Sequence, residues 1–160
     1  MQPEAPFAPL GTNPVQEDAM RVDELMSRPK CCGETDTVRT CAKLMKEENI
    51  GFVPICDDEG KPVGAVTDRD LTIRVLAEGR SADEKIGAFM TRDPIACRTG
   101  DDVEEAERLM RDHRKSRIMV CDDQGRLVGV ISLADVADAE PSRTAGQTLQ
   151  QVKSDQPTAH

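Results

Sequence analysis

Two hydrophobic periods alternate along the chain and predict helices and strands in a regular order. Apolar residues that recur every three or four positions indicate an amphipathic helix, and short continuous apolar runs bounded by turn residues indicate buried strands. In the first half these patterns predict, in order, a helical lead from Met20, an extended segment over 30–33, a helix over 37–49, strands over 52–56 and 63–67, and a helix over 68–78. The short turn Asp57-Asp58-Glu59-Gly60 predicts that the two strands form an antiparallel hairpin.

The second half repeats this order. Its expected elements are a helical lead with Ile86, Phe89 and Met90, an extended segment over 95–97, a helix that begins after Asp101, strands over 118–121 and 128–132, and a helix over 133–139. Aligned without gaps, residues 29–70 and 94–135 share thirteen identical residues. A unit of about 60 residues buries only about 60% of its surface. We therefore expect an α/β (α+β) fold in which two tandem βαββα repeats pack with pseudo-two-fold symmetry and leave two similar clefts.

The same patterns divide the chain into segments and suggest where the helices begin. We expect a flexible, proline-rich leader over 1–19, a first repeat over 20–80, a second repeat over 81–139 and a polar tail over 140–160. Thr35-Asp36 is expected to cap the helix of the first repeat. Asp101, with Glu104 three residues later, is expected to cap that of the second.

One motif occurs in both repeats where a buried strand meets a helix. It reads Gly, two apolar residues, a hydroxyl residue, two further residues and an aspartate, once ending in Thr67 and Asp70 and once in Ser132 and Asp135. The hydroxyls stand at expected N-caps, beside free N–H groups and the positive end of a helix dipole. A carboxylate there suits a sugar diol and the amides suit an anion. The alternative is structural: the hydroxyls cap the helices and the acids stabilise the dipole.

Charge and composition narrow the range of partners. A net charge of −9 works against non-specific binding to nucleic acid or to an anionic membrane, because both are polyanions. With three Phe and no Trp or Tyr, the chain has no aromatic platform for stacked bases. No apolar run approaches the roughly 18 residues of a membrane span, and the N-terminus lacks the basic and apolar segments of a signal peptide. We therefore expect a cytoplasmic protein that binds neither nucleic acid nor membrane.

The six cysteines form no C-x-x-C pair and have no histidine at ligand spacing. Cys56 and Cys121 are equivalent in the two repeats and lie inside apolar strands, so we interpret them as small buried hydrophobes. The adjacent Cys31 and Cys32 leave a second interpretation open, a redox-sensitive or soft-metal site.

With these features in place, residues 20–139 resemble the tandem CBS-domain pair, or Bateman module, and in particular the small stand-alone bacterial members of that family. The resemblance rests on three features that occur in both repeats. They are the Gly-x-x-Thr/Ser-x-x-Asp motif, a lead that reads Met-x-x-Pro or Met-x-x-x-Pro, and an acidic hairpin turn.

The resemblance implies a regulatory module, not an enzyme, that senses adenosyl nucleotides such as AMP, ADP, ATP, S-adenosylmethionine or NAD-like compounds in the clefts between the repeats. It implies no required cofactor and no metal, a homodimer formed through the helix faces over 71–76 and 133–137, and a regulated protein that the sequence does not identify. The roles it implies are ribose binding by Asp70 and Asp135, phosphate or ribose contact by Thr67 and Ser132, phosphate binding by Arg117, and an adenine pocket lined by Cys32, Ile95 and Cys97.

The two clefts cannot be chemically equal, because Phe52 in the first repeat stands where Arg117 stands in the second. One cleft is therefore expected to bind a charged nucleotide, and the other to bind weakly or to stay empty. Two other functions remain open. One is a structural dimerisation or interaction module with vestigial clefts, and the other is a thiol or metal sensor that uses Cys31, Cys32 and Cys97.

Overall fold

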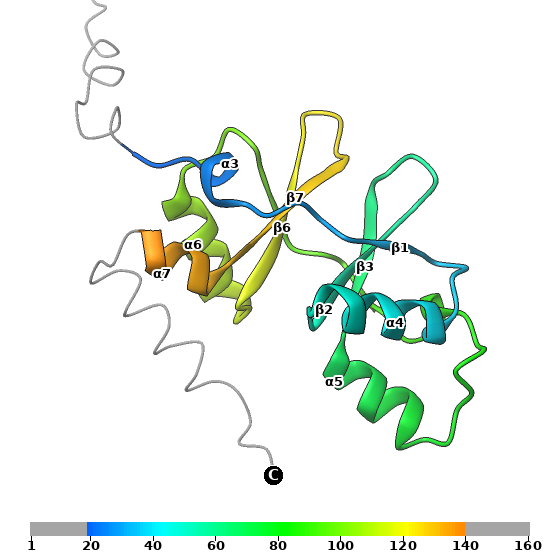
Figure 1. The fold of residues 1–160 in the computed structure, drawn as a ribbon. Coiled ribbons are helices and arrows are strands. Elements are labelled where there is room, and N and C mark those ends of the chain that lie inside the picture. Colours follow the sequence, from blue (N-terminus) through cyan, green and yellow to red (C-terminus); the bar gives the residue numbers. More distant parts are fainter. Residues whose placement is uncertain (1–18, 140–160) are drawn as a thin grey trace, which may run out of the picture.

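The computed structural model describes residues 19–139, and within them it shows the two expected repeats, each of the form βαββα. The two units lie side by side (Figure 1). The first consists of β1 (Cys32–Gly33), α4 (Val38–Glu48), β2 (Phe52–Cys56), β3 (Pro62–Thr67), α5 (Asp68–Asp70) and a π-helix (Leu71–Leu76). The second consists of β5 (Ala96–Arg98), α6 (Val103–His113), β6 (Arg117–Cys121), β7 (Leu127–Ser132) and α7 (Leu133–Ala139). The predicted mixed fold of two tandem repeats is confirmed. The predicted leader and tail lie outside the described residues.

The strands form two sheets of the same design. In the first, the order is β1-β2-β3-β4, and in the second it is β5-β6-β7. In both sheets the first pair is parallel and the second pair is the predicted antiparallel hairpin. The edge strand β4 (Thr91–Arg92) comes from the lead of the second repeat and pairs with β3. Its counterpart in the second sheet is an isolated bridge between Ser27 and Val130.

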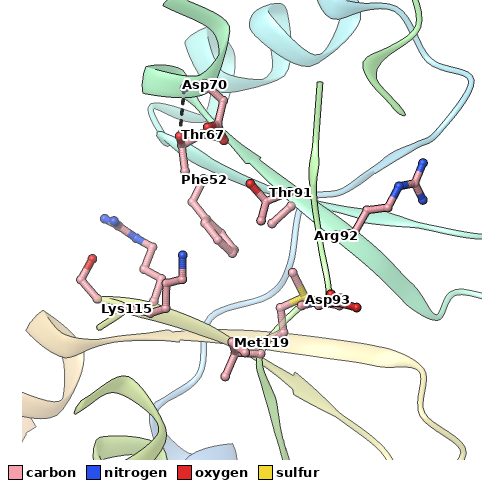
Figure 2. A pocket seen from close by; sticks show the side chains of 13 residues that line it. Phe52, Thr67, Asp70, Thr91, Arg92, Asp93, Lys115 and Met119 are labelled. Carbon is pink, nitrogen blue, oxygen red and sulfur yellow. Dashed lines mark hydrogen bonds between the residues drawn. The ribbon is translucent and has the colours of Figure 1, made fainter. Parts of the chain in front are cut away.

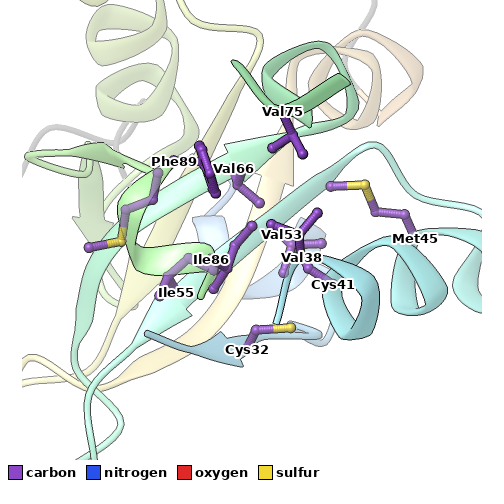
Figure 3. Packing of buried hydrophobic residues seen from close by; sticks show 11 residues of the cluster. Cys32, Val38, Cys41, Met45, Val53, Ile55, Val66, Val75, Ile86 and Phe89 are labelled. Atoms are coloured by element: carbon purple, nitrogen blue, oxygen red, sulfur yellow. The ribbon is translucent and has the colours of Figure 1, made fainter. Parts of the chain in front are cut away.

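The lead segments are exchanged between the two hydrophobic cores. The short helix α3 (Val22–Leu25) comes first in the described chain, yet Val22 is fully buried in the core of the second repeat (Figure 1). Conversely, Ile86, Phe89 and Met90 are buried in the core of the first repeat. Figure 3 shows Ile86 beside Val53 of β2 and Phe89 beside Val66 of β3. Each buried side chain of this size contributes about 1.5–3 kcal/mol, so each core depends on the other half of the chain.

Exchanged leads explain the glycine that opens each motif. A Cβ atom on Gly64 would lie 2.7 Å from both Sδ of Met90 and the carbonyl oxygen of Thr91. A Cβ on Gly129 would overlap the side chain of Met26, which belongs to the first lead. Each methionine lead therefore crosses directly over the other repeat's β-hairpin, and only glycine leaves room for it.

Two predicted helix caps are shifted by one or two residues. The caps are Thr37, whose hydroxyl accepts from Thr40 N at 3.1 Å, and Asp102, which makes no side-chain capping bond. Asp36 and Asp101 instead accept the backbone N–H of Gly33 and Arg98, each at 2.8 Å. These acids therefore hold the turn before the helix and not the helix itself.

The helix that follows the first motif is distorted. It begins at Asp68 as predicted but widens into a π-helix over Leu71–Leu76. The hydroxyl of Thr72 donates to the carbonyl of Asp68 at 3.0 Å, and side-chain bonding of this kind bends helices. Val75 faces the core, whereas Ile73 and Leu76 are 45% and 75% exposed. Within residues 19–139, no helix is both long and apolar enough to cross a membrane.

Candidate functional site

Two clefts lie between the repeats, and each is built from both halves of the chain. The first, here called the Thr67 cleft, has a volume of about 230 Å³, and the second, the Ser132 cleft, about 270 Å³. Side chains that line the Thr67 cleft include Phe52, Thr67, Asp70, Ile95, Lys115 and Arg117. Those that line the Ser132 cleft include Arg28, Lys30, Phe52, Arg117, Ser132 and Asp135. The volumes fall near the lower end of small-molecule pockets, about 300 Å³.

The hydroxyl and the carboxylate of each motif form a reciprocal capping box. Asp70 N donates to the hydroxyl of Thr67 at 3.1 Å, and Thr67 N donates to Oδ2 of Asp70 at 2.8 Å (Figure 2). Ser132 and Asp135 make the same two bonds at 3.1 and 2.9 Å. The structural role considered above is therefore present in both repeats. It occupies one carboxylate oxygen of each aspartate and leaves the other for a further contact.

The second carboxylate oxygen has different surroundings in the two clefts. Oδ1 of Asp70 lies 3.8 Å from Nε of Arg74, one helical turn later. The equivalent of Arg74 in the second repeat is Ala139, so α7 offers Asp135 no such cation. Within residues 19–139 the structure records no ion pair for Asp135. The carboxylate of the Ser132 cleft is therefore the more available of the two.

Cross-strand pairing places different side chains beside the two hydroxyls. Phe52 pairs with Thr67 across the first hairpin, and Arg117 pairs with Ser132 across the second. Figure 2 shows the Phe52 ring inside the Thr67 cleft, between the Thr67–Asp70 pair and Met119 on the opposite wall. The equivalent position in the Ser132 cleft carries a guanidinium. An apolar ring thus stands at the first hydroxyl and a cation at the second.

The cations of the clefts differ in how they are paired. Arg92 lines the Thr67 cleft but lies 3.4 Å from Glu34, and Lys30 of the Ser132 cleft lies 3.8 Å from Glu48. Lys115, Arg117 and Arg28 are exposed and make no ion pair with any other residue in 19–139. Each cleft is therefore lined by at least two cations that form no ion pair within the described residues, Arg117 being common to both clefts.

Most of the predicted site residues converge. Thr67, Asp70, Ile95 and Arg117 meet in the Thr67 cleft. Ser132, Asp135 and, again, Arg117 meet in the Ser132 cleft.

Cys32 and Cys97 are placed elsewhere. They are 5% and 4% exposed, and they belong to the two hydrophobic cores, because each occupies a buried position of its strand, β1 or β5. The walls of the clefts are formed instead by the residues next to the prolines, Lys30 and Ile95. Arg28 and Lys30, which line the Ser132 cleft, were not among the predicted site residues. Their positions, equivalent to Asp93 and Ile95 of the other cleft, could have indicated them.

The cysteines of the first repeat lie in two close pairs. A hydrogen bond with Cys41 lowers the pKa of Cys32 and raises that of Cys41. Burial, together with the neighbouring Cys31, raises the pKa of Cys56 to about 12. All six cysteines are free thiols. Within residues 19–139 no three His, Cys, Asp or Glu side chains are grouped as a metal site requires.

The fold and the paired clefts define a class: duplicated α/β modules whose repeats share ligand-sized clefts at their junction. The model of the CBS domain matches twice, at residues 22–77 and 86–142, and the chain belongs to the CBS-domain family.

The chain is also similar in sequence to individual proteins. The chain is 34% identical to the uncharacterised protein MK0525 of Methanopyrus kandleri over 77% of its own length and 64% of that protein, less than two thirds of it. It is 32% identical to hypoxic response protein 1 of Mycobacterium tuberculosis, over 76% of this chain and 85% of that one.

Two solved structures have the same fold. The structure of hypoxic response protein 1 with two coordinated zinc ions matches with a TM-score of 0.68 at 30% identity, over 74% of this chain and 98% of that one. The CBS-domain pair of protein MJ0100, in complex with 5′-methylthioadenosine and S-adenosylmethionine, matches with a TM-score of 0.67 at 26% identity. It covers 78% of this chain and 98% of that one.

Proposed function

We propose that the protein is a regulatory module that binds adenosyl ligands in the Thr67 and Ser132 clefts. The observation that carries this proposal is the composition of each cleft. A hydroxyl–carboxylate pair from one repeat faces at least one unpaired cation from the other half of the chain, Lys115 and Arg117 in the Thr67 cleft and Arg28 in the Ser132 cleft. Asp70 and Asp135 would accept from ribose hydroxyls through the oxygen that the capping box leaves over. Lys115, Arg117 and Arg28 would hold phosphate. The MJ0100 relative, which binds two adenosyl compounds, supports this ligand class.

We assign the clefts to binding rather than to catalysis. Among residues 19–139, neither cleft is lined by a histidine or a cysteine. The carboxylates of Asp70 and Asp135 each already accept a backbone N–H group. Such a set of groups lacks the paired nucleophile and base of a catalytic site. The structure of hypoxic response protein 1 contains two coordinated zinc ions. In the described part of this chain, no three His, Cys, Asp or Glu side chains are grouped as a metal site requires.

Regulation would follow from the shared walls of the clefts. A ligand in either cleft touches both repeats, so it favours the relative orientation that closes on it. We propose that the orientation is read by a second copy of the chain or by a partner. Ile73 and Leu76 offer an apolar surface on the π-helix that is suited to a homodimer in the cytoplasm.

The test is ligand binding measured by calorimetry and by thermal melting with AMP, ATP, adenosine, S-adenosylmethionine and 5′-methylthioadenosine. We expect a rise in melting temperature with at least one of them, because a ligand that binds only the folded state stabilises it. Asp135→Ala is expected to weaken binding in one cleft. No shift with any of these ligands at millimolar concentration would favour the alternative, a dimerisation module with vestigial clefts. Unchanged affinity after Asp70→Ala and Asp135→Ala together would contradict ribose recognition.

A further inference from the structure

Two side chains, Phe52 and Arg117, line both clefts. They occupy equivalent positions in the two repeats, as the first residues of β2 and β6. Each lies next to the hydroxyl of its own repeat and also reaches the cleft on the other side of the pseudo-two-fold axis. The two clefts are therefore separate volumes that share one pair of side chains at their boundary.

Only one member of this pair carries a charge. The Arg117 side chain is exposed, and no carboxylate within residues 19–139 holds it, so its guanidinium is available to a ligand on either side. A guanidinium binds phosphate most strongly through a planar fork of two parallel N–H groups, so a side chain that turns this fork toward a phosphate in one cleft turns it away from the other cleft. Each cleft also has a cation of its own, Lys115 in the Thr67 cleft and Arg28 in the Ser132 cleft. Both clefts can therefore hold an anion, but only one can hold it with Arg117.

We propose that Arg117 couples the two clefts, so that a phosphate-bearing ligand in one cleft withdraws the guanidinium from the other and weakens binding of a second such ligand about tenfold. This inference rests on the function proposed above and concerns how the two sites are regulated. The size lies within the usual range of coupling between sites, about 5–150-fold. A ligand without phosphate does not compete for the guanidinium. The coupling therefore depends on the charge of the ligand and not on its adenosine part.

The first experiment compares AMP with adenosine on the full chain by isothermal titration calorimetry. We expect AMP to bind with two dissociation constants about tenfold apart, and adenosine to show a smaller difference between its two constants. If the two differences are equal, the inference is wrong while the proposed function stands. If neither compound binds, the inference is wrong, and the proposed function is contradicted only if ATP, S-adenosylmethionine and 5′-methylthioadenosine also fail to bind.

Two clefts that differ in affinity without communicating would also give two constants for AMP, and single-cleft variants separate the cases. Asp70→Ala and Asp135→Ala each weaken one cleft and leave the other to bind AMP alone. If Arg117 is shared, neither variant shows the weak constant of the wild type, because the remaining cleft always has the guanidinium. If the clefts are independent, one of the two variants shows that weak constant, and the inference is overturned.

Substitutions of Arg117 and Phe52 test directly whether the shared guanidinium causes the coupling, and they do not alter the capping boxes. Arg117→Gln is expected to weaken binding of the first AMP molecule. It should also reduce the difference between the two dissociation constants to that seen with adenosine. Phe52→Arg supplies a second guanidinium at the equivalent position. It is therefore expected to strengthen binding of the second AMP molecule and to leave the affinity for the first unchanged. Lys115→Gln is the matched control: it removes a cation of one cleft alone, and the coupling is expected to persist. A tenfold difference that survives Arg117→Gln would show repulsion between phosphates instead and would refute the inference.

Discussion

The glycine that opens each motif is needed by the lead segment of the other repeat. At Gly64 the obstacle to a side chain includes backbone, the carbonyl of Thr91, and so a methyl group there forces β4 to move. At Gly129 the three nearest atoms all belong to the side chain of Met26. The glycine of this motif is thus a packing requirement, whereas the hydroxyl and the aspartate serve the cap and the cleft.

This difference gives a prediction for Gly64→Ala. We expect the free energy of unfolding to fall by about 1–3 kcal/mol, as for other overpacked sites, measured by chemical denaturation. Gly100→Ala is the control, because no atom lies within 4 Å of a Cβ built there. It should change stability by less than about 0.5 kcal/mol. Equal losses in the two variants would mean that the crossing of the lead is not tight.

We also expect the six thiols to differ strongly in reactivity. Burial raises the pKa of Cys97 to about 12, and that of Cys56 is raised to about 12 as well. A thiol with a raised pKa stays protonated until the pH approaches that value, and the protonated form is a poor nucleophile. Cys31 is the one exposed cysteine.

We therefore expect one fast-reacting thiol of six at pH 8, mapped by iodoacetamide labelling and mass spectrometry. Cys31→Ser should remove the fast phase. The other five thiols are buried, including Cys32 with its lowered pKa, and should react only on unfolding. Fast labelling of Cys97 in the native protein would contradict its burial and would revive the thiol-sensor alternative.

At the scale of elements, the hydroxyl of the motif has two roles that can be separated. Ser132 caps α7 and lines a cleft, whereas Thr37 caps α4 and lines neither cleft. Loss of either cap should cost about 1 kcal/mol. Ser132→Ala and Thr37→Ala are therefore expected to lower the melting temperature similarly, but only Ser132→Ala should weaken AMP binding in calorimetry. Equal effects on binding would mean that Ser132 acts through the helix alone.

The sequence predicted the elements well where hydrophobic period and turn residues agree. Both hairpins follow from apolar runs around the acidic turns, and their observed bounds differ from the predicted ones by at most one residue. The N-cap positions are harder to predict, because neighbouring polar residues compete for the capping position. Asp36 and Asp101 have the right chemistry to cap, but each accepts a turn N–H instead, that of Gly33 or Arg98.

The same reasoning explains which parts of the clefts were predicted. Thr67 and Asp70, like Ser132 and Asp135, are fixed by local sequence, since a capping box involves residues three apart. Arg28 and Lys30 were missed because they reach the Ser132 cleft only through the exchange of the leads. Periodicity shows that a lead is buried, but it does not show in which core.

At the scale of the whole molecule, the two cores should not be separable at the sequence boundary between the repeats. A fragment of residues 1–80 lacks Ile86, Phe89 and Met90, and we expect it to show no cooperative thermal transition by circular dichroism. A fragment of residues 28–93 contains every buried residue of the first core and is the matched control. We expect it to be the more structured of the two. A cooperative transition for residues 1–80 alone would contradict the dependence of one core on the other's lead.

The exchange of leads also sets an order for synthesis on the ribosome. The first sheet cannot gain its edge strand until Thr91 and Arg92 have left the exit tunnel, which is well after its own hairpin is available. Val22 must wait longer still, since its partners in the second core include Val136, near the end of the described chain. The nascent protein therefore carries its first lead unattached through most of translation, and the last described helix to emerge is the one that closes over it.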